Sequence, residues 1–291
     1  MTPKQRPEAV QFALPKGRIK DGVLALLSEA GITVTNSVRG YRPTLSIPGF
    51  ETKMLKPQNI VEMLSCGTRD LGFAGADWVL EKEADLVEII DTGLDPVRLI
   101  AAAPEASLQN PDFLNGPLVV ASEYEVLARR WIESKGISGS LVRTYGATEV
   151  FPPEDADIIV DNIATGATLR ANGLRVFDEL LQSSTRLYAS PQAMANPVKR
   201  ELIDNLTLCL KAVIEARTRA MIDLNVSPAA LEEVIDALDC MREPTVSGLH
   251  GSAGFAVRAA VKRRSIPSLI PQLKARGATD IVVSRCEQIV P

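Results

Sequence analysis

Residues 157–174 read DIIVDNIATGATLRANGL, an apolar strand that leads through a glycine-containing turn into a helix. The run at 156–160 has the length of a buried strand, and the residues at 165–172 follow as a helix. The strand ends in an acid, Asp161, and the turn contains two threonines. A turn that only reverses the chain needs neither feature. This stretch therefore predicts a binding loop at the carboxyl end of a strand in an α/β fold.

The same turn carries donors suited to a phosphate group. Backbone N–H groups at a helix start bind phosphate together with the helix dipole, and the hydroxyls of Thr165 and Thr168 add donors. Gly166 lets the backbone approach a ligand closely. Asp157 and Asp161 suit the two hydroxyls of a ribose, directly or through Mg²⁺. We therefore predict a ribose-5-phosphate site. The alternative is that Asp161 caps a helix and Gly166 only fills a turn.

Strand and helix patterns alternate up to residue 190, which predicts parallel sheets with helices on both faces. The alternation forms two series and so predicts two lobes with a ligand cleft between them. Expected strands are 10–14, 44–47 and 52–55 (these two as a hairpin), 70–75, 97–103, 117–122, 140–145, 156–160, 174–182 (strand or short helix) and 185–190, and expected helices are 19–30, 57–66, 123–135 and 165–172.

The pattern changes after residue 190. Asn196 and Pro197 are typical of an N-cap followed by proline at the first helical position, and a long apolar stripe follows them. Beyond it, the order strand, helix, strand, strand, helix, strand is that of a ferredoxin-like module of about 75 residues. Its expected elements are 219–226, 227–238 (capped by Ser227), 244–249, 255–263, 266–277 and 280–286.

Cations form a second candidate group. In LPKGR (14–18), Lys16 and Arg18 follow the first strand and suit a pyrophosphate or triphosphate. The alternative, two solvated cations at a helix start, opposes the helix dipole. Arg98 is a further cation near a strand end. Gly75 in DLGFAGADW could admit a purine or a phosphate, or serve close packing. Glu149 in YGATE could contact ligand or only start a helix.

Composition excludes several classes of protein. The net charge of −4 gives no global field that favours nucleic acid. No run approaches the roughly 20 apolar residues of a membrane span, and no signal peptide is visible, so we expect a cytoplasmic protein without membrane contact. The four cysteines form no C-x-x-C pair and are expected to be buried free thiols. The single histidine, His250, excludes a His-rich metal site.

The motifs LPKGR, DLGFAGADW, GATE and above all DIIVDNIATGATLRANGL resemble ATP phosphoribosyltransferase, the first enzyme of histidine biosynthesis. EPTVSGL and FAVRAAV resemble the carboxyl-terminal regulatory module of its long form. The resemblance covers nearly the whole chain. Two segments depart from it: KPQN (56–59) stands where Arg-Pro-Gln-Asp is common, and LDPVRL (94–99) replaces a loop that often carries glycine and cysteine.

The resemblance implies an α/β fold with a two-lobed, periplasmic-binding-protein-like catalytic core and a ferredoxin-like (ACT-type) regulatory domain. Lobe I would span 1–103 and 184–215, lobe II 104–183, and the regulatory domain 216–291. The implied reaction (EC 2.4.2.17) joins adenine N1 of ATP to 5-phosphoribosyl 1-pyrophosphate (PRPP), with Mg²⁺ as cofactor, histidine as inhibitor, and a homo-oligomer between dimer and hexamer.

The resemblance also implies roles for individual residues. Two groups would act on the substrates, and metal ligation is assigned to none of them. The residues expected to be catalytic are Lys16, Arg18, Asp157 and Asp161, and those expected to bind substrate are Glu149, Thr165, Gly166, Ala167, Thr168, Leu169, Gly75 and Arg98.

Other readings stay open at this point. A non-catalytic two-lobed small-molecule-binding protein would also have two α/β lobes around a cleft. A purine-salvage phosphoribosyltransferase shares the acid-then-threonine loop. Residues 258–285 carry seven basic residues against one acid, which is either a nucleic-acid patch or, as we favour, a set of solvated strand ends that discourage edge pairing.

Overall fold

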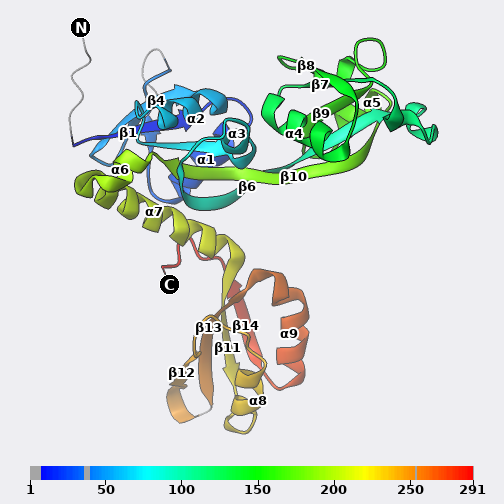
Figure 1. Cartoon of the computed structure of the whole chain (residues 1–291). Coiled ribbons are helices and arrows are strands. Elements are labelled where there is room, and N and C mark those ends of the chain that lie inside the picture. Colours follow the sequence, from blue (N-terminus) through cyan, green and yellow to red (C-terminus); the bar gives the residue numbers. More distant parts are fainter. Residues whose placement is uncertain (1–7, 36–39, 253, 291) are drawn as a thin grey trace. The chain divides into compact units, whose positions relative to one another are not determined.

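A computed structural model describes residues 8–35, 40–252 and 254–290 (Figure 1). The chain divides into two compact units, the first formed by Met1–Ala25 and Thr33–Ile203, the second by Leu26–Ile32 and Asp204–Pro291. Helix α7 (Pro197–Thr218) runs without interruption past residue 203 and past the expected domain boundary after residue 215. That boundary therefore stays a prediction. The α/β class is confirmed.

The first unit is built on one sheet of eight strands in the order β4-β1-β5-β10-β6-β9-β7-β8. Its two halves are parallel at their outer strands, and two long antiparallel strands, β6 and β10, pass through both halves (Figure 1). The bounds are β1 Val10–Pro15, β4 Phe50–Leu55, β5 Leu71–Gly75, β6 Val87–Pro104, β7 Leu118–Ser122, β8 Gly139–Arg143, β9 Ile158–Ile163 and β10 Leu174–Ala189.

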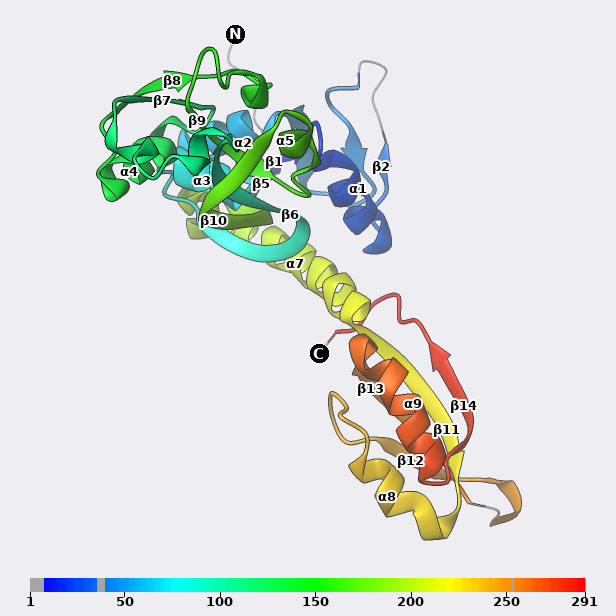
Figure 2. The same cartoon turned by 90° about the vertical axis from the view of Figure 1, so that its right-hand side faces the viewer.

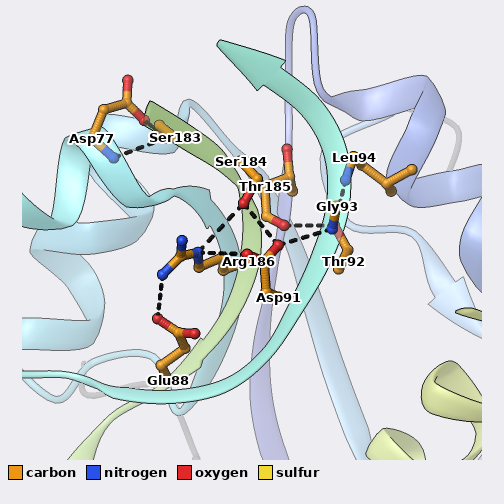
Figure 3. A network of polar contacts seen from close by, with 10 residues as sticks. All are labelled: Asp77, Glu88, Asp91, Thr92, Gly93, Leu94, Ser183, Ser184, Thr185 and Arg186. Atoms are coloured by element: carbon orange, nitrogen blue, oxygen red, sulfur yellow. Dashed lines mark hydrogen bonds and ion pairs between the residues drawn. The ribbon is translucent and has the colours of Figure 1, made fainter. Parts of the chain in front are cut away.

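Strands β6 and β10 are longer than expected. Gly93 and Pro96 suggest a break, but the chain continues through register shifts opposite Ser183 to Arg186, with φ values of +64° at Gly93 and +47° at Asp95. Bulges of this kind bend a strand without ending it. Figure 3 shows the polar contacts at the bend: Ser184 Oγ donates to Asp91 at 2.7 Å, and the Gly93 N–H donates to the same oxygen at 2.8 Å.

The predicted hairpin of 44–47 with 52–55 is wrong. Strand β3 (Thr44–Leu45) pairs instead with β2 (Val34–Thr35), and β4 joins the main sheet parallel to β1. The reason lies in the burial of β4, whose Thr52 and Met54 are buried although the strand is at the sheet edge. These side chains have a core to cover only when β4 lies beside β1.

Apolar helix faces cover the sheet of the first unit. Burial on both faces explains the uninterrupted apolar run IIV at 158–160 in β9: Ile158 and Val160 belong to a cluster with Trp131, whereas Ile159 packs with Leu169 on the other face. A strand buried on both faces needs no alternation. The helices are α1 Lys20–Glu29, α2 Pro57–Ser65, α3 Ala76–Glu81, α4 Glu125–Lys135, α5 Ala167–Ala171 and α6 Pro191–Ala195.

The second unit contains a four-stranded antiparallel sheet in the order β12-β13-β11-β14, with two helices against one face (Figure 2). Ile222, Leu224 and Val257 of the sheet pack with Leu273 of α9, so the predicted ferredoxin-like order is confirmed. The bounds are β11 Arg219–Val226, α8 Leu231–Asp236, β12 Thr245–Gly248, β13 Phe255–Lys262, α9 Ile266–Ala275 and β14 Thr279–Ser284.

Local predictions had mixed outcomes. Asn196 caps α7 as expected, since its Oδ1 accepts the N–H of Val198 at 3.0 Å and of Lys199 at 3.2 Å. Ser227 stands at an N-cap position without a side-chain hydrogen bond to the helix. The cysteines are free but not buried: Cys66 and Cys209 are exposed, and the other two are half-buried. No helix in the described ranges is long and apolar enough to cross a membrane.

Candidate active site

The parallel strands of the second half of the sheet end at one edge, and a cavity of about 380 Å³ lies there. Glu123 follows β7, the loop at 146–149 follows β8, and Asp161 is in the second half of strand β9. Arg18, from the turn between β1 and α1, also lines this cavity. Carboxyl ends of parallel strands are the usual ligand position in α/β sheets, so this is the candidate active site.

The predicted phosphate loop forms one wall of the cavity. Gly166 has a φ of +69° and stands at the N-cap of α5. The N–H groups of Ala167, Thr168 and Leu169 therefore begin a helix and have no partner within it. Thr165 Oγ1 accepts from the Ala167 N–H at 3.4 Å, which leaves its hydroxyl hydrogen free to donate. The wall is a group of donors that faces a cavity, as a phosphate requires.

Asp161 is the acid with the most altered proton affinity in this cavity. Its pKa is raised from 3.8 to about 6, chiefly by burial and to a smaller extent by the carboxylates of Glu123 and Glu149. The Asn162 N–H, which donates to Asp161 Oδ1 at 2.7 Å, and the charge of Arg18 act in the opposite direction. Perturbed acids of this kind mark sites that bind cations or polar ligands.

The structure brings together eight of the twelve predicted site residues. They are two acids, one cation and the whole turn that leads into α5. The eight residues that line the cavity are Arg18, Glu149, Asp161, Thr165, Gly166, Ala167, Thr168 and Leu169.

The other four predicted residues do not line the cavity. Asp157 precedes β9 at the opposite end of the strand, and its Oδ2 accepts the N–H of Val119 at 2.7 Å. Lys16 Nζ lies 3.7 Å from the ring centroid of Tyr41.

Arg98 and Gly75 also have other surroundings. Arg98 pairs with Glu179 at 3.0 Å. Gly75 serves close packing, since a Cβ there would come within 2.1 Å of Asp77 Oδ1.

Sequence reasoning missed Glu123 and Asn162, which also line the cavity. Glu123 follows an apolar strand directly, so it repeats the acid-after-strand signal of Asp161. That signal was read as the start of a helix. Asn162 gives no signal in the sequence, because its contribution depends on Tyr124, whose Oη accepts from its Nδ2 at 2.8 Å.

The acids of the cavity fit Mg²⁺ in one particular way. Among the described residues, no three His, Cys, Asp or Glu side chains are grouped so as to hold a metal ion. Mg²⁺ is usually held by one or two carboxylates together with substrate phosphates and water. The carboxylates of Asp161 and Glu149 supply such oxygen donors, so the residues present fit Mg²⁺ that arrives with a phosphorylated ligand.

The two-halved sheet with a cavity at its strand ends places the chain among two-lobed α/β proteins of the periplasmic-binding-protein type. A family profile described as ATP phosphoribosyltransferase matches residues 56–212, and one described as HisG, C-terminal domain, matches residues 216–288. The chain belongs to the ATP phosphoribosyltransferase family, as the sequence motifs indicated. Because it also has the C-terminal domain, it is a member of the long form of that family and is a phosphoribosyltransferase.

Individual relatives agree with this assignment. The chain is 34% identical over 278 residues to an ATP phosphoribosyltransferase of Chlorobaculum parvum, with 94% of each chain covered. It is 34% identical over 288 residues to that of Pelotomaculum thermopropionicum, with 97% and 99% covered. A solved ATP phosphoribosyl transferase (HisG:HisZ) complex from Thermotoga maritima matches with a TM-score of 0.63 and 27% identity, over 71% of this chain and 98% of that one.

Proposed function

We propose that this chain joins adenine N1 of ATP to the anomeric carbon of PRPP and releases pyrophosphate, the first step of histidine biosynthesis. One observation carries the proposal: the donor-rich turn before α5 and the acid of β9 line one cavity. Such a pair of features suits a phosphate attached to a sugar ring. The family assignment favours this enzyme over a non-catalytic binding protein.

The turn at 165–168 would hold the 5-phosphate of PRPP. Its N–H groups and two hydroxyls supply donors without a counter-charge from a side chain, so binding depends on the backbone shape at Gly166. Leu169 is buried beneath the turn and fixes α5 against the sheet. The phosphate would anchor the sugar with its reacting carbon toward the carboxylates.

Asp161 and Glu149 would face the ribose hydroxyls and the metal. A hydroxyl donor restores the hydrogen bonds that Asp161 loses on burial, so ligand binding should favour its charged form. When bound, Mg²⁺ would neutralise charge on the pyrophosphate leaving group. Glu123, at the same strand edge, would strengthen the negative potential that attracts the metal.

Arg18 would meet the pyrophosphate. It is exposed and lines the cavity from the other half of the sheet, so its guanidinium would stabilise the charge that develops as the bond to the anomeric carbon breaks. Adenine N1 carries no proton, so no general base is needed and positioning supplies much of the rate. Lys16, in the same turn, stays a predicted contact for polyphosphate. Asp157, Gly75 and Arg98 have no role in this proposal.

Regulation and assembly are also proposals. The family's long form suggests that the ferredoxin-like module binds histidine as a feedback inhibitor and supports a homo-oligomer in the cytoplasm. The match to a complex from Thermotoga maritima supports assembly into a larger particle. Titration of activity with histidine, and light scattering of the purified chain, would test these two points.

The reaction is tested by incubating the chain with ATP, PRPP and Mg²⁺ and following pyrophosphate release together with the mass of the nucleotide product. We expect one phosphoribosyl group on ATP for each pyrophosphate released. A reaction with free adenine in place of ATP would identify a purine-salvage enzyme instead. Binding of PRPP without any pyrophosphate release would overturn the proposal.

A further inference from the structure

A second cavity, of about 590 Å³, lies within the second unit and is strongly basic. It is bounded by the end of α7, the start of β11, the end of β13 and the turn at Arg263–Ser265. Five cations and one acid line it. The lining residues are Glu215, Arg217, Thr218, Arg219, Lys262, Arg263 and Arg264.

Three of these cations already have acidic partners. Arg219 pairs with Glu215 at 2.6 Å, which neutralises the only acid of the lining. Arg217 donates two hydrogen bonds of 2.9 Å to the carboxylate of Glu29. Lys262 pairs with Asp239 at 2.8 Å.

The remaining two cations differ from these. The side chains of Arg263 and Arg264 make no hydrogen bond or ion pair with any residue in the described parts of the chain, and Arg264 acts only at longer range on the carboxyl of Asp239. Two adjacent guanidinium groups beside three other cations repel one another, and an anion between them would relieve that repulsion. Guanidinium groups bind phosphate through paired hydrogen bonds.

We propose that this cavity binds a small anion that carries one to three phosphate groups. The lining itself carries +4, five cations less one acid, and +2 when Glu29 and Asp239, which pair with Arg217 and Lys262 from outside the lining, are counted. A phosphate group carries about −1.5 to −2, so one to three groups match this range of charge. The volume lies in the range of about 300–1,000 Å³ that is typical of small-molecule sites.

Nucleic acid suits this cavity less well. No aromatic side chain is among its lining residues, so bases would have no surface on which to stack. The chain as a whole is negative, with a net charge of −4. The basic stretch 258–285 is also divided in the fold, since Arg258 pairs with Asp223 on the sheet face whereas only its residues 262–264 line the cavity.

Binding there would connect the junction of α7 and β11, at Thr218 and Arg219, to the end of β13. A ligand that contacts Arg217 or Arg219 on one side and Arg263 or Arg264 on the other ties the end of α7 to the end of β13. Because such a ligand binds the folded chain only, it should raise the temperature of unfolding as its concentration rises.

The test is calorimetric titration of the full chain with inorganic tripolyphosphate at about 150 mM salt, which screens weak, non-specific attraction between exposed charges. The variant Arg263→Ala/Arg264→Ala is compared with Lys274→Ala/Arg276→Ala, which removes the same charge from α9 and its C-cap, away from the cavity. We expect a binding event in the wild type that weakens at least about 100-fold in the first variant, tenfold for each arginine, and persists in the second.

Both variants should keep the wild-type circular dichroism spectrum and the wild-type temperature of unfolding without tripolyphosphate, which shows that they fold. Identical isotherms in all three proteins, or equal weakening in both variants, would overturn the proposal. So would a single-stranded oligonucleotide that binds more tightly than tripolyphosphate and depends on Arg263 and Arg264. Failure of the transferase reaction would not affect this result, because the readout is binding in the second unit.

Discussion

The phenol of Tyr124 donates a hydrogen bond to Asp77 Oδ2 at 2.5 Å, and this bond links the two halves of the first unit. Asp77 lies on α3 and also accepts from Ser183 Oγ at 2.7 Å, a contact shown in Figure 3. Tyr124 stands at the N-cap of α4 and stacks on Trp78. Because Asn162 donates to the same phenol, the wall of the cavity is held by a residue of the other half.

Replacing Tyr124 with Phe should therefore affect both stability and substrate binding. Burial, and then the charge of Asp77, raise the pKa of this phenol, so it stays a donor at all working pH values. The variant leaves a buried carboxylate and Asn162 each without one partner, which should cost about 2 kcal/mol in free energy of unfolding. We also expect KM for PRPP to rise more than kcat falls.

Urea denaturation and steady-state kinetics would measure the two effects. Tyr145→Phe is the matched control, because Tyr145 is 84% exposed and should change neither quantity. Equal stability of the Tyr124 variant and the wild type would show that the phenol contributes nothing to the contact between the halves.

Asp161→Asn tests the acid of the cavity. The lost charge-assisted hydrogen bond to the ribose should lower kcat/KM for PRPP by about 30-fold, or about 2 kcal/mol. Because the pKa of Asp161 is about 6, kcat/KM of the wild type should also fall about tenfold per pH unit below pH 6. The variant should not show this fall.

Asp157→Asn is the matched control for that variant. Its side chain keeps an oxygen that can accept the Val119 N–H at the far end of β9, so kinetics should change little. Comparable losses in the two variants would assign the effect to the folding of β9 and not to ligand contact.

The raised pKa of Asp161 also predicts how stability depends on pH. Its pKa is 3.8 in the unfolded chain and about 6 when burial and the neighbouring carboxylates act on it. Between these values the folded chain binds more protons, so the free energy of unfolding falls as the pH rises from about 4 to 6, by about 3 kcal/mol in all, and is then level.

Urea denaturation of the wild type and Asp161→Asn across this pH range would measure the contribution of Asp161 to the free energy of unfolding. The variant has no such proton, so its stability relative to the wild type should increase by that amount between pH 4 and pH 7. A difference between the two proteins that is constant with pH would contradict the prediction.

The sequence predicted those parts of the fold and site that depend on neighbouring residues. Strand β9 and the turn at 165–168 follow from a short apolar run, a glycine and two threonines, and the ferredoxin-like order follows from local patterns. The continuity of β6 was hidden because Gly93 and Pro96 resemble a turn, whereas pairing with β10 carries the strand through them. Local signals do not report pairing across more than 80 residues.

Two differences between the sequence prediction and the cavity have the same origin. Asp157 and Asp161 are close in sequence, but a strand rises about 3.3 Å per residue, so four residues separate the two ends of β9. The link between Asp77 and Tyr124 joins residues that are 47 positions apart, and either one alone gives the pattern of an ordinary helix start. The sequence could place the phosphate turn, but it could not show which side chains from other strands would surround it.

The last prediction concerns the backbone at Gly166, whose φ of +69° suits glycine and disfavours a β-branched residue. Gly166→Val should distort the turn and lower PRPP affinity at least about tenfold, because a β-branched residue strains this φ and moves the N–H groups that would bind the phosphate.

Gly173→Val separates this effect from simple strain. Gly173 has a φ of +68° and open space around a Cβ, and it does not line the cavity. Both substitutions should cost a similar 1–2 kcal/mol, roughly, in stability, but only the first should weaken PRPP binding in equilibrium titrations. If Gly166→Val bound PRPP as tightly as Gly173→Val and the wild type do, the turn before α5 would not be the phosphate site. The ligand would then have to be sought elsewhere along the strand ends.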